Sequence, residues 1–198
     1  MRLQTIWRTA LCSALLISPP ALRAADQAVI DNSGQYNEGA LSVNQAAGNL
    51  NQQANIRAIA NNPDGQAAVT LSAGLTNGNR APMASGQASA RIDGDSFSHN
   101  TGVVGVNQSA GSQNSTANLV GIAYGGSGTV LAASDALLAG THAPSGAAEQ
   151  TTPTNYQASI SDQAFQGTRG VVQVNQVAGA LNQAVNTLTV SFVRPEGN

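Results

Sequence analysis

The sequence predicts an all-β fold in which three stacked β-arch repeats form a short β-solenoid, or cross-β amyloid-like layer stack, with disordered linkers. The first observation is a segment of 13 residues that occurs three times without gaps, starting at Val43, Val106 and Val174, with 7 positions identical in all copies. The second is that 5 of these 7 identities fall on alternate positions. Alternation is typical of a β-strand, whose residues i, i+2 and i+4 share one face. Self-similarity at a nearly fixed offset is typical of solenoids and repeat arrays.

The N-terminus has the pattern of an export signal. Arg2 and Arg8 form a positive region, residues 9–17 are largely apolar, and Ala24 supplies a small residue at the expected cut. We therefore expect a signal peptide over residues 1–24. The apolar stretch is shorter than the roughly 20 residues that span a bilayer, which predicts an exported product without stable membrane insertion.

The chain after residue 24 is poor in charge and contains no cysteine. It has 5 Arg against 10 Asp and Glu, which gives a net charge of −5. Disulfides therefore cannot hold this fold together. A net charge this small also opposes self-association only weakly.

The composition excludes most enzymatic and nucleic-acid-binding chemistry. The 198 residues include 36 Asn and Gln against 18 charged residues, and all 8 basic residues are Arg, so no basic face for nucleic acid is expected. The 2 histidines, His99 and His142, stand beside no carboxylate cluster or second ligand. This removes most metal and acid–base chemistry. We expect no catalytic, metal-binding or cofactor-binding residue, no cofactor, and no enzymatic activity.

The repeats divide the chain after the signal peptide into five segments. Repeat 1 covers residues 25–60, repeat 2 covers 91–123, and repeat 3 with the C-terminal tail covers 159–198. The segments 61–90 and 124–158 share no pattern with each other and are rich in small residues and turn formers. We interpret them as linkers that lie outside the stack.

Within each repeat, one set of alternate positions has aliphatic ends and a carboxamide middle. We expect this set to form one inward face of a strand–turn–strand layer, with a glycine at the bend where the backbone needs a positive φ. The predicted bend glycines are Gly48, Gly111 and Gly179. The predicted inward face is the self-assembly ladder, made of Val43, Gln45, Ala47, Asn51, Asn55, Val106, Gln108, Ala110, Asn114, Asn118, Val174, Gln176, Ala178, Asn182 and Asn186.

Stacking of the repeats explains how a buried row of amides is tolerated. Each unsatisfied buried polar group costs about 1–3 kcal/mol. When equivalent residues lie above one another at the strand spacing of about 4.8 Å, each amide bonds to the next, as in cross-β assemblies. The outer layers still expose amides and strand edges, and the chain has no lysine to protect such edges. We therefore expect a further molecule to pair with the exposed amides and strand edges of the outer layers.

The segment from Gly39 to Asn55 resembles the repeat of the Fap functional-amyloid (biofilm fibril) subunits of Pseudomonas-type bacteria. The order of signal peptide, three repeats and two dissimilar linkers is also similar. The resemblance implies a secreted fibril component of the biofilm matrix, exported through the inner membrane, passing the periplasm and ending in an extracellular fibril or at the cell surface. It also implies self and related amyloid subunits as partners, and an outer-membrane secretion pore in transit. Major subunits of that family are expected to carry a Cys-x-x-Cys near the C-terminus; this chain has none, which favours a minor or accessory member.

Two functions remain open at this point. In the first, the chain is a minor subunit or nucleator that joins the fibril. In the second, it is a periplasmic accessory, chaperone-like factor that controls assembly of the amyloid subunit by β-augmentation. A β-solenoid adhesin ranks last, because the few aromatic residues do not repeat at strand spacing.

Overall fold

The computed structural model describes residues 25–62, 64–77, 86–126, 131–140 and 155–193. Within these residues all regular structure is β-strand, and no helix is long and apolar enough to cross a membrane. The signal peptide predicted over residues 1–24 lies outside the described residues. The strands are β1 (Asp26–Asp31), β2 (Glu38–Ala47), β3 (Gln52–Asn62), β4 (Ala68–Asn77), β5 (Gln87–Asp93), β6 (Thr101–Ser112), β7 (Ser115–Gly125), β8 (Leu131–Gly140), β9 (Asn155–Ile160), β10 (Arg169–Ala180) and β11 (Gln183–Val193).

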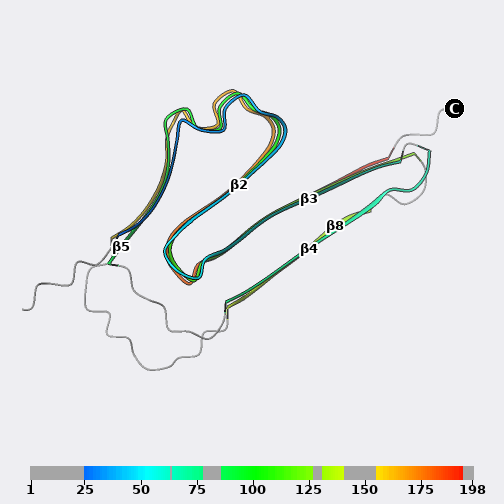
Figure 1. Ribbon diagram of the computed structural model, residues 1–198. Helices are drawn as coiled ribbons and strands as arrows, with labels where there is room; N and C mark the ends of the chain where they lie inside the picture. Colours follow the sequence, from blue (N-terminus) through cyan, green and yellow to red (C-terminus); the bar gives the residue numbers. More distant parts are fainter. Residues whose placement is uncertain (1–24, 63, 78–85, 127–130, 141–154, 194–198) are drawn as a thin grey trace, which may run out of the picture.

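The strands form three stacked layers. Layer 1 contains β1 to β4, layer 2 contains β5 to β8, and layer 3 contains β9 to β11. Viewed along the stacking direction, the three layers superimpose and follow the same winding path through sheets A, B and C, and layers 1 and 2 continue into β4 and β8 (Figure 1). Equivalent strands pair in parallel into sheet A (β1-β5-β9), sheet B (β2-β6-β10), sheet C (β3-β7-β11) and sheet D (β4-β8). Layer 2 is therefore the middle of each three-stranded sheet, and the predicted stack of three in-register repeats is confirmed.

Glycine columns fix how closely the layers approach. The bend glycines Gly48, Gly111 and Gly179 have φ values of +97°, +107° and +125°, so the predicted positive backbone angle is confirmed. A Cβ atom on Gly111 would collide with the carbonyl oxygen of Gly179 in the next layer, and one on Gly48 would collide with that of Gly111. Only glycine permits this backbone conformation and this spacing together.

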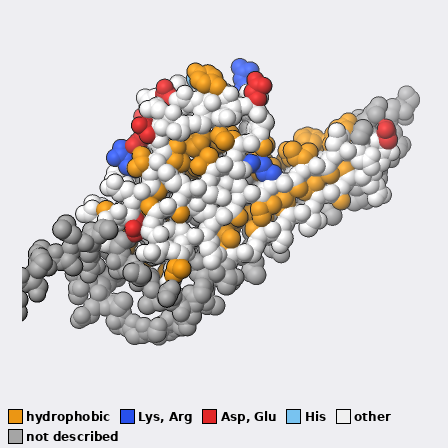
Figure 2. Space-filling model, in the orientation of Figure 1, with side chains coloured by type: hydrophobic (Ala, Val, Ile, Leu, Met, Phe, Trp, Pro, Cys, Tyr) orange, Lys and Arg blue, Asp and Glu red, His pale blue; other side chains and the backbone are white. Residues whose placement is uncertain are grey.

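Apolar side chains fill two of the three spaces between the sheets. Between sheets A and B lie Ile30, Ile92, Phe97, Val104 and Val106, beside a smaller alanine cluster. Between sheets C and D lie Ala67, Val69, Leu71, Ala73, Ala117, Leu119 and Ala123. Figure 2 shows hydrophobic side chains along the arm formed by sheets C and D and in the space between sheets A and B. The third space, between sheets B and C, is polar and holds most of the amides.

The linkers were expected to be disordered and to lie outside the stack, and this prediction is wrong for much of their length. The first contains β4 and the second contains β8, which pair in register from Ala68 with Leu131 to Asn77 with Gly140. In β4, Val69 and Leu71 are buried and Thr70 is exposed. This alternation produces an apolar face that sheet C covers. The layers also begin earlier than the repeats suggested, because β5 starts at Gln87 and β9 at Asn155.

Candidate self-assembly surface

All fifteen predicted ladder residues lie in in-register columns that run through the three layers. The five columns are Val43–Val106–Val174, Gln45–Gln108–Gln176, Ala47–Ala110–Ala178, Asn51–Asn114–Asn182 and Asn55–Asn118–Asn186. The valine and alanine columns pack in the apolar space between sheets A and B. The other three columns carry the amide chemistry.

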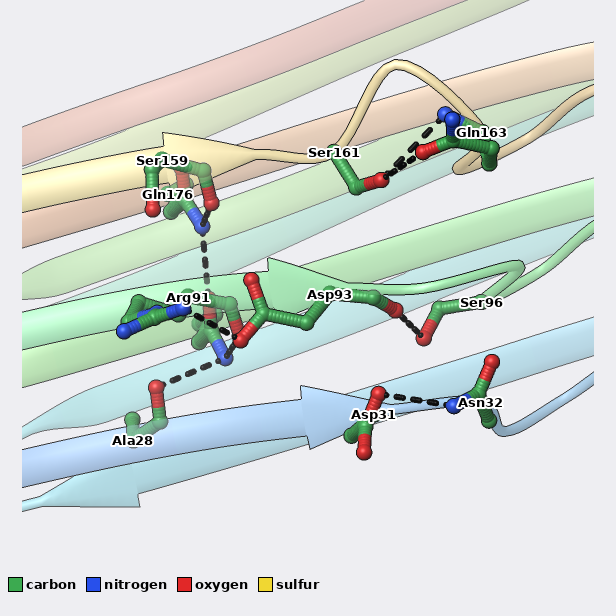
Figure 3. A network of polar contacts seen from close by, with 11 residues as sticks. Ala28, Asp31, Asn32, Arg91, Asp93, Ser96, Ser159, Ser161, Gln163 and Gln176 are labelled. Atoms are coloured by element: carbon green, nitrogen blue, oxygen red, sulfur yellow. Dashed lines mark hydrogen bonds and ion pairs between the residues drawn. The ribbon is translucent and has the colours of Figure 1, made fainter.

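The glutamine column joins sheet B to sheet A. The Nε2 atom of Gln176 donates to Oε1 of Gln108 at 2.8 Å, and Nε2 of Gln108 donates to Oε1 of Gln45 at 2.7 Å. Each Nε2 atom also donates to a backbone carbonyl of sheet A. In layer 3 the acceptor is Ser159 at 2.9 Å and in layer 2 it is Arg91 at 2.8 Å, as Figure 3 shows in part. The column therefore links layers and sheets with the same nitrogen atoms.

The Asn55 column performs the same task between sheets C and B. Nδ2 of Asn186 donates to Oδ1 of Asn118, and Nδ2 of Asn118 donates to Oδ1 of Asn55, both at 3.0 Å. Nδ2 of Asn118 also donates to the backbone carbonyl of Val106 at 3.1 Å, across the space between the two sheets. The same bond to sheet B recurs in layers 1 and 3.

The Asn51 column stabilises the bend of each arch. Nδ2 of Asn182 donates to Oδ1 of Asn114 at 2.9 Å, and Nδ2 of Asn114 donates to Oδ1 of Asn51 at 3.0 Å. The same oxygen atoms accept the backbone N–H groups of Asn182 and Asn114, at 3.1 Å each. One amide oxygen thus satisfies a backbone and a side-chain donor of the layer above.

A fourth amide column, Asn44–Asn107–Asn175, was not assigned to the ladder. Nδ2 of Asn175 donates to Oδ1 of Asn107, and Nδ2 of Asn107 donates to Oδ1 of Asn44, both at 3.0 Å. The column is cross-linked to the Asn55 column, since Nδ2 of Asn118 also donates to Oδ1 of Asn107 at 3.1 Å. Asn107 is fully buried. The signal that identifies this column is its identity in all three repeats.

The expectation that the predicted ladder forms one inward face in each repeat is wrong. In sheet B the predicted face, with Gln45, points to sheet A, whereas in sheet C the predicted face, with Asn55, points to sheet B. The bend between β2 and β3 contains two residues with positive φ, Gly48 and Leu50. Left-handed residues break the two-residue alternation, so a face cannot be followed through the bend by counting. Each arch consequently has Asn44 and Asn55, not Gln45, in its interior.

One charged side chain lies in the polar space between sheets B and C. The guanidinium of Arg57 donates to Oγ of Ser42 and to the backbone carbonyl of Leu41. A Cβ atom on Gly105 in layer 2 would lie 2.7 Å from an Arg57 nitrogen, so the glycine leaves the room that this side chain occupies. Burial lowers the pKa of Arg57 below its usual value. This column does not repeat, because Val120 and Leu188 stand in the other layers.

The amide columns all have the same polarity. In each of the four, the nitrogen of layer 3 donates to the oxygen of layer 2, and the nitrogen of layer 2 donates to the oxygen of layer 1. Because an amide is planar, its oxygen points away from the layer to which its nitrogen donates. The outer face of layer 3 therefore presents amide oxygens, and the outer face of layer 1 presents amide nitrogens.

The outer faces of layers 1 and 3 are also the apolar part of the surface. Among the described residues, the large hydrophobic side chains classed as exposed all belong to these two layers. Examples are Ile59, with an exposed fraction of 68%, in layer 1 and Phe192, with 53%, in layer 3. In layer 2 the same kinds of residue are covered from both sides, and Val106 and Leu119 are fully buried. A surface with exposed strand edges and apolar groups is typical of a site that adds further strands.

A parallel, in-register β-stack with amide ladders and two open end faces defines an amyloid-like, self-assembling protein. No solved structure matches this chain. The chain belongs to the Functional amyloid protein FapB/FapC family, whose model matches residues 16–193. This membership, which agrees with the resemblance seen in the repeats, makes the chain a component of functional-amyloid fibrils of the biofilm. The family is one of structural proteins that self-assemble as amyloid.

Proposed function

We propose that this chain is a minor subunit or nucleator of a secreted functional-amyloid fibril in the biofilm matrix. The observation that carries the proposal is that both end faces expose the columns that layer 2 buries. Gln108 and Asn114 in layer 2 are fully buried, whereas their equivalents in layers 1 and 3 are only half-buried. Adding a molecule to either end gives those amides the surroundings that they have in layer 2.

In this proposal, the next molecule is recruited by the members of the five ladder columns and of the Asn44 column that lie in layers 1 and 3. An added layer extends the backbone ladders of sheets A, B and C and the four amide columns at once. The gain per layer is therefore the sum of many modest hydrogen bonds of about 1 kcal/mol each. The end faces also bury exposed apolar groups, at about 25 cal/mol per Å². The bond geometry of layer 2 specifies which register gives this gain.

The role of minor subunit or nucleator is supported by two features of the chain. It contains a single cysteine, Cys12, within the predicted signal peptide, and it has no Cys-x-x-Cys near the C-terminus. The folded stack also presents end faces across sheets A, B and C, and these faces need no prior association of two chains. A template of this kind removes the slow step of bringing the first strands together, because pairing of distant segments costs loop-closure entropy.

The proposed partners are other copies of this chain and related amyloid subunits. We further propose that the chain leaves the cell in two steps, first with the signal peptide over residues 1–24 and then through an outer-membrane pore. The ends of the fibril would then lie outside the cell or at its surface. The low content of charge, 9% of the residues, is consistent with a chain whose partner surfaces are not repelled by like charge.

The test is a seeded aggregation assay with the purified chain, residues 25–198. Alone, it is expected to form β-rich fibrils that bind amyloid dyes and resist detergent. Added below equimolar amounts to a major subunit of the same family, it is expected to shorten the lag phase. If the chain instead stays soluble and delays fibril formation by that subunit, the accessory chaperone-like function replaces this proposal.

A further inference from the structure

The two end faces of the stack carry opposite charges at one equivalent position. Glu38 in layer 1, Thr101 in layer 2 and Arg169 in layer 3 form an in-register column at the start of sheet B. Glu38 and Arg169 are both exposed. Within one molecule they are two layers apart, about 10 Å at the usual strand spacing. The one ion pair between described residues joins Arg91 to Asp93, within layer 2.

A continued stack brings these two charges together between molecules. If layer 3 of one copy lies on layer 1 of the next with the register found inside the chain, Arg169 and Glu38 become direct neighbours in the column. Their backbones are then about 4.8 Å apart, the distance between adjacent strands. Opposite charges directly across paired strands are favourable, and like charges there are unfavourable.

The amide polarity is compatible with this direction. The outer face of layer 3 presents oxygens such as Oδ1 of Asn175, and the outer face of layer 1 presents nitrogens such as Nδ2 of Asn44. The bond of 3.0 Å from Nδ2 of Asn107 to Oδ1 of Asn44 is the bond that Asn44 of the next copy would repeat on Asn175. Two layer 1 faces placed against each other would oppose nitrogen to nitrogen, and this contact would not repeat the layer-to-layer arrangement found inside the chain.

The glycine columns also continue across such a junction. A Cβ atom on Gly102 would collide with the carbonyl of Gly39, and one on Gly170 would collide with that of Gly102. Gly39 lies on the open face of layer 1, and a Cβ atom there meets nothing within 4 Å. Its φ of +102° is nevertheless the same kind of conformation as in the other two layers. Gly39 is therefore shaped to receive the Gly170 carbonyl of a neighbouring copy.

We propose that copies of this chain join head to tail, with layer 3 of one on layer 1 of the next, and that an ion pair between Arg169 and Glu38 sets this direction and register. This inference rests on the proposed function, since it describes the junction of the same fibril. The pair acts as a specificity element, because an exposed ion pair contributes little to total affinity but discriminates against the wrong neighbour.

The test is a charge exchange in the full mature chain at low salt. Each single variant, Glu38→Arg or Arg169→Glu, is expected to raise the concentration of protein left soluble at the end of assembly about tenfold. The lost attraction and the new repulsion each raise this concentration by about threefold. The double variant Glu38→Arg/Arg169→Glu is expected to return to within about twofold of the wild type, because it restores one positive and one negative charge at each junction. An equimolar mixture of the two single variants should co-assemble, since each variant then finds the opposite charge on the other.

The control for Glu38→Arg is Asp64→Arg, an exposed position outside sheet B at which the net charge changes by the same amount. It is expected to leave the soluble concentration within about twofold of the wild type. In 1 M salt, where the Debye length is about 3 Å, the differences between all variants should shrink. If the wild type forms fibrils but the exchange fails to restore assembly, the junction is wrong and the proposed function stands. If the wild type forms no fibrils with or without a related subunit, both are overturned.

Discussion

The substitution Gln108→Met tests the amide ladder at its most buried point. Methionine has nearly the same length and shape as glutamine but has no amide, so it removes the hydrogen bonds with little change in packing. Gln108 is fully buried. Its Nε2 atom donates to Oε1 of Gln45 and to the carbonyls of Arg91 and Ala28, and its Oε1 atom accepts from Gln176 at 2.8 Å.

The expected loss follows from the groups that the substitution leaves without a partner. Oε1 of Gln45 and the carbonyls of Arg91 and Ala28 each lose a donor, whereas Nε2 of Gln176 keeps its bond to the Ser159 carbonyl. The loss of the two N–H groups that served these acceptors, at about 1–3 kcal/mol each, less the gain from an apolar side chain in an apolar space, gives about 2–4 kcal/mol. With an m-value of about 2 kcal/mol/M in urea, the unfolding midpoint should fall by about 1–2 M.

The assay is a urea titration of the mature chain followed by far-ultraviolet circular dichroism, with Gln27→Met as the matched control. Gln27 lies in β1 of the same structure and is exposed. Its substitution should change the free energy of unfolding by less than about 0.5 kcal/mol. Equal shifts for Gln108→Met and Gln27→Met would refute the reasoning, because they would show that the amide column contributes nothing beyond surface polarity.

Three further predictions concern the backbone, sheet D and the thiol content. Gly111→Ala should prevent stacking, because the added Cβ atom collides with the Gly179 carbonyl and the residue has a φ of +107°. Gly74→Ala should assemble like the wild type, because a Cβ atom there meets nothing within 4 Å. Dye-binding kinetics compare the two variants. Leu71→Ala should lower the free energy of unfolding by about 2–5 kcal/mol in the urea titration, and Thr70→Ala, one residue away but exposed, by less than about 0.5 kcal/mol; equal losses would contradict a structured β4. Fibril growth of residues 25–198 should be unchanged by reducing agent, because that segment has no cysteine, and a slower rate in dithiothreitol would contradict this.

The deletion of segment 61–90 illustrates how the structure changes an expectation. As a linker, this segment could be removed with little effect on assembly, and loss of residues 159–198 would matter more. It contains β4, however, whose Val69 and Leu71 belong to the apolar cluster between sheets C and D. Strand β4 also contacts both β3 and β7, so it holds layers 1 and 2 together. Both deletions are therefore expected to weaken the stack.

The repeat by itself determined the stacking, the register and most of the amide ladders. Identical residues at constant offsets can lie over one another only if the layers are parallel and in register, and amides need that arrangement to be satisfied. The glycines at the bend were identified for the same local reason, since a positive φ and a close approach both favour glycine. These conclusions depend on the neighbouring layer alone, which the repeat specifies.

The tertiary structure alone decided which sheet each face meets. Alternation gives two faces to every strand, but Gly48 and Leu50 have positive φ values and interrupt the alternation at the bend. As a result, Asn44 lies inside the arch, whereas Gln45 faces sheet A. The rings of Phe97 and Phe165 stack with their centroids 5.2 Å apart, and both residues lie in irregular segments without the two-residue alternation of a strand. Strand β4 has a weak signal because its buried face is made of small aliphatic residues, and it becomes ordered by packing on sheet C. Local periodicity specifies a strand and its neighbours above and below, whereas contact between sheets depends on backbone turns that the side-chain pattern does not encode.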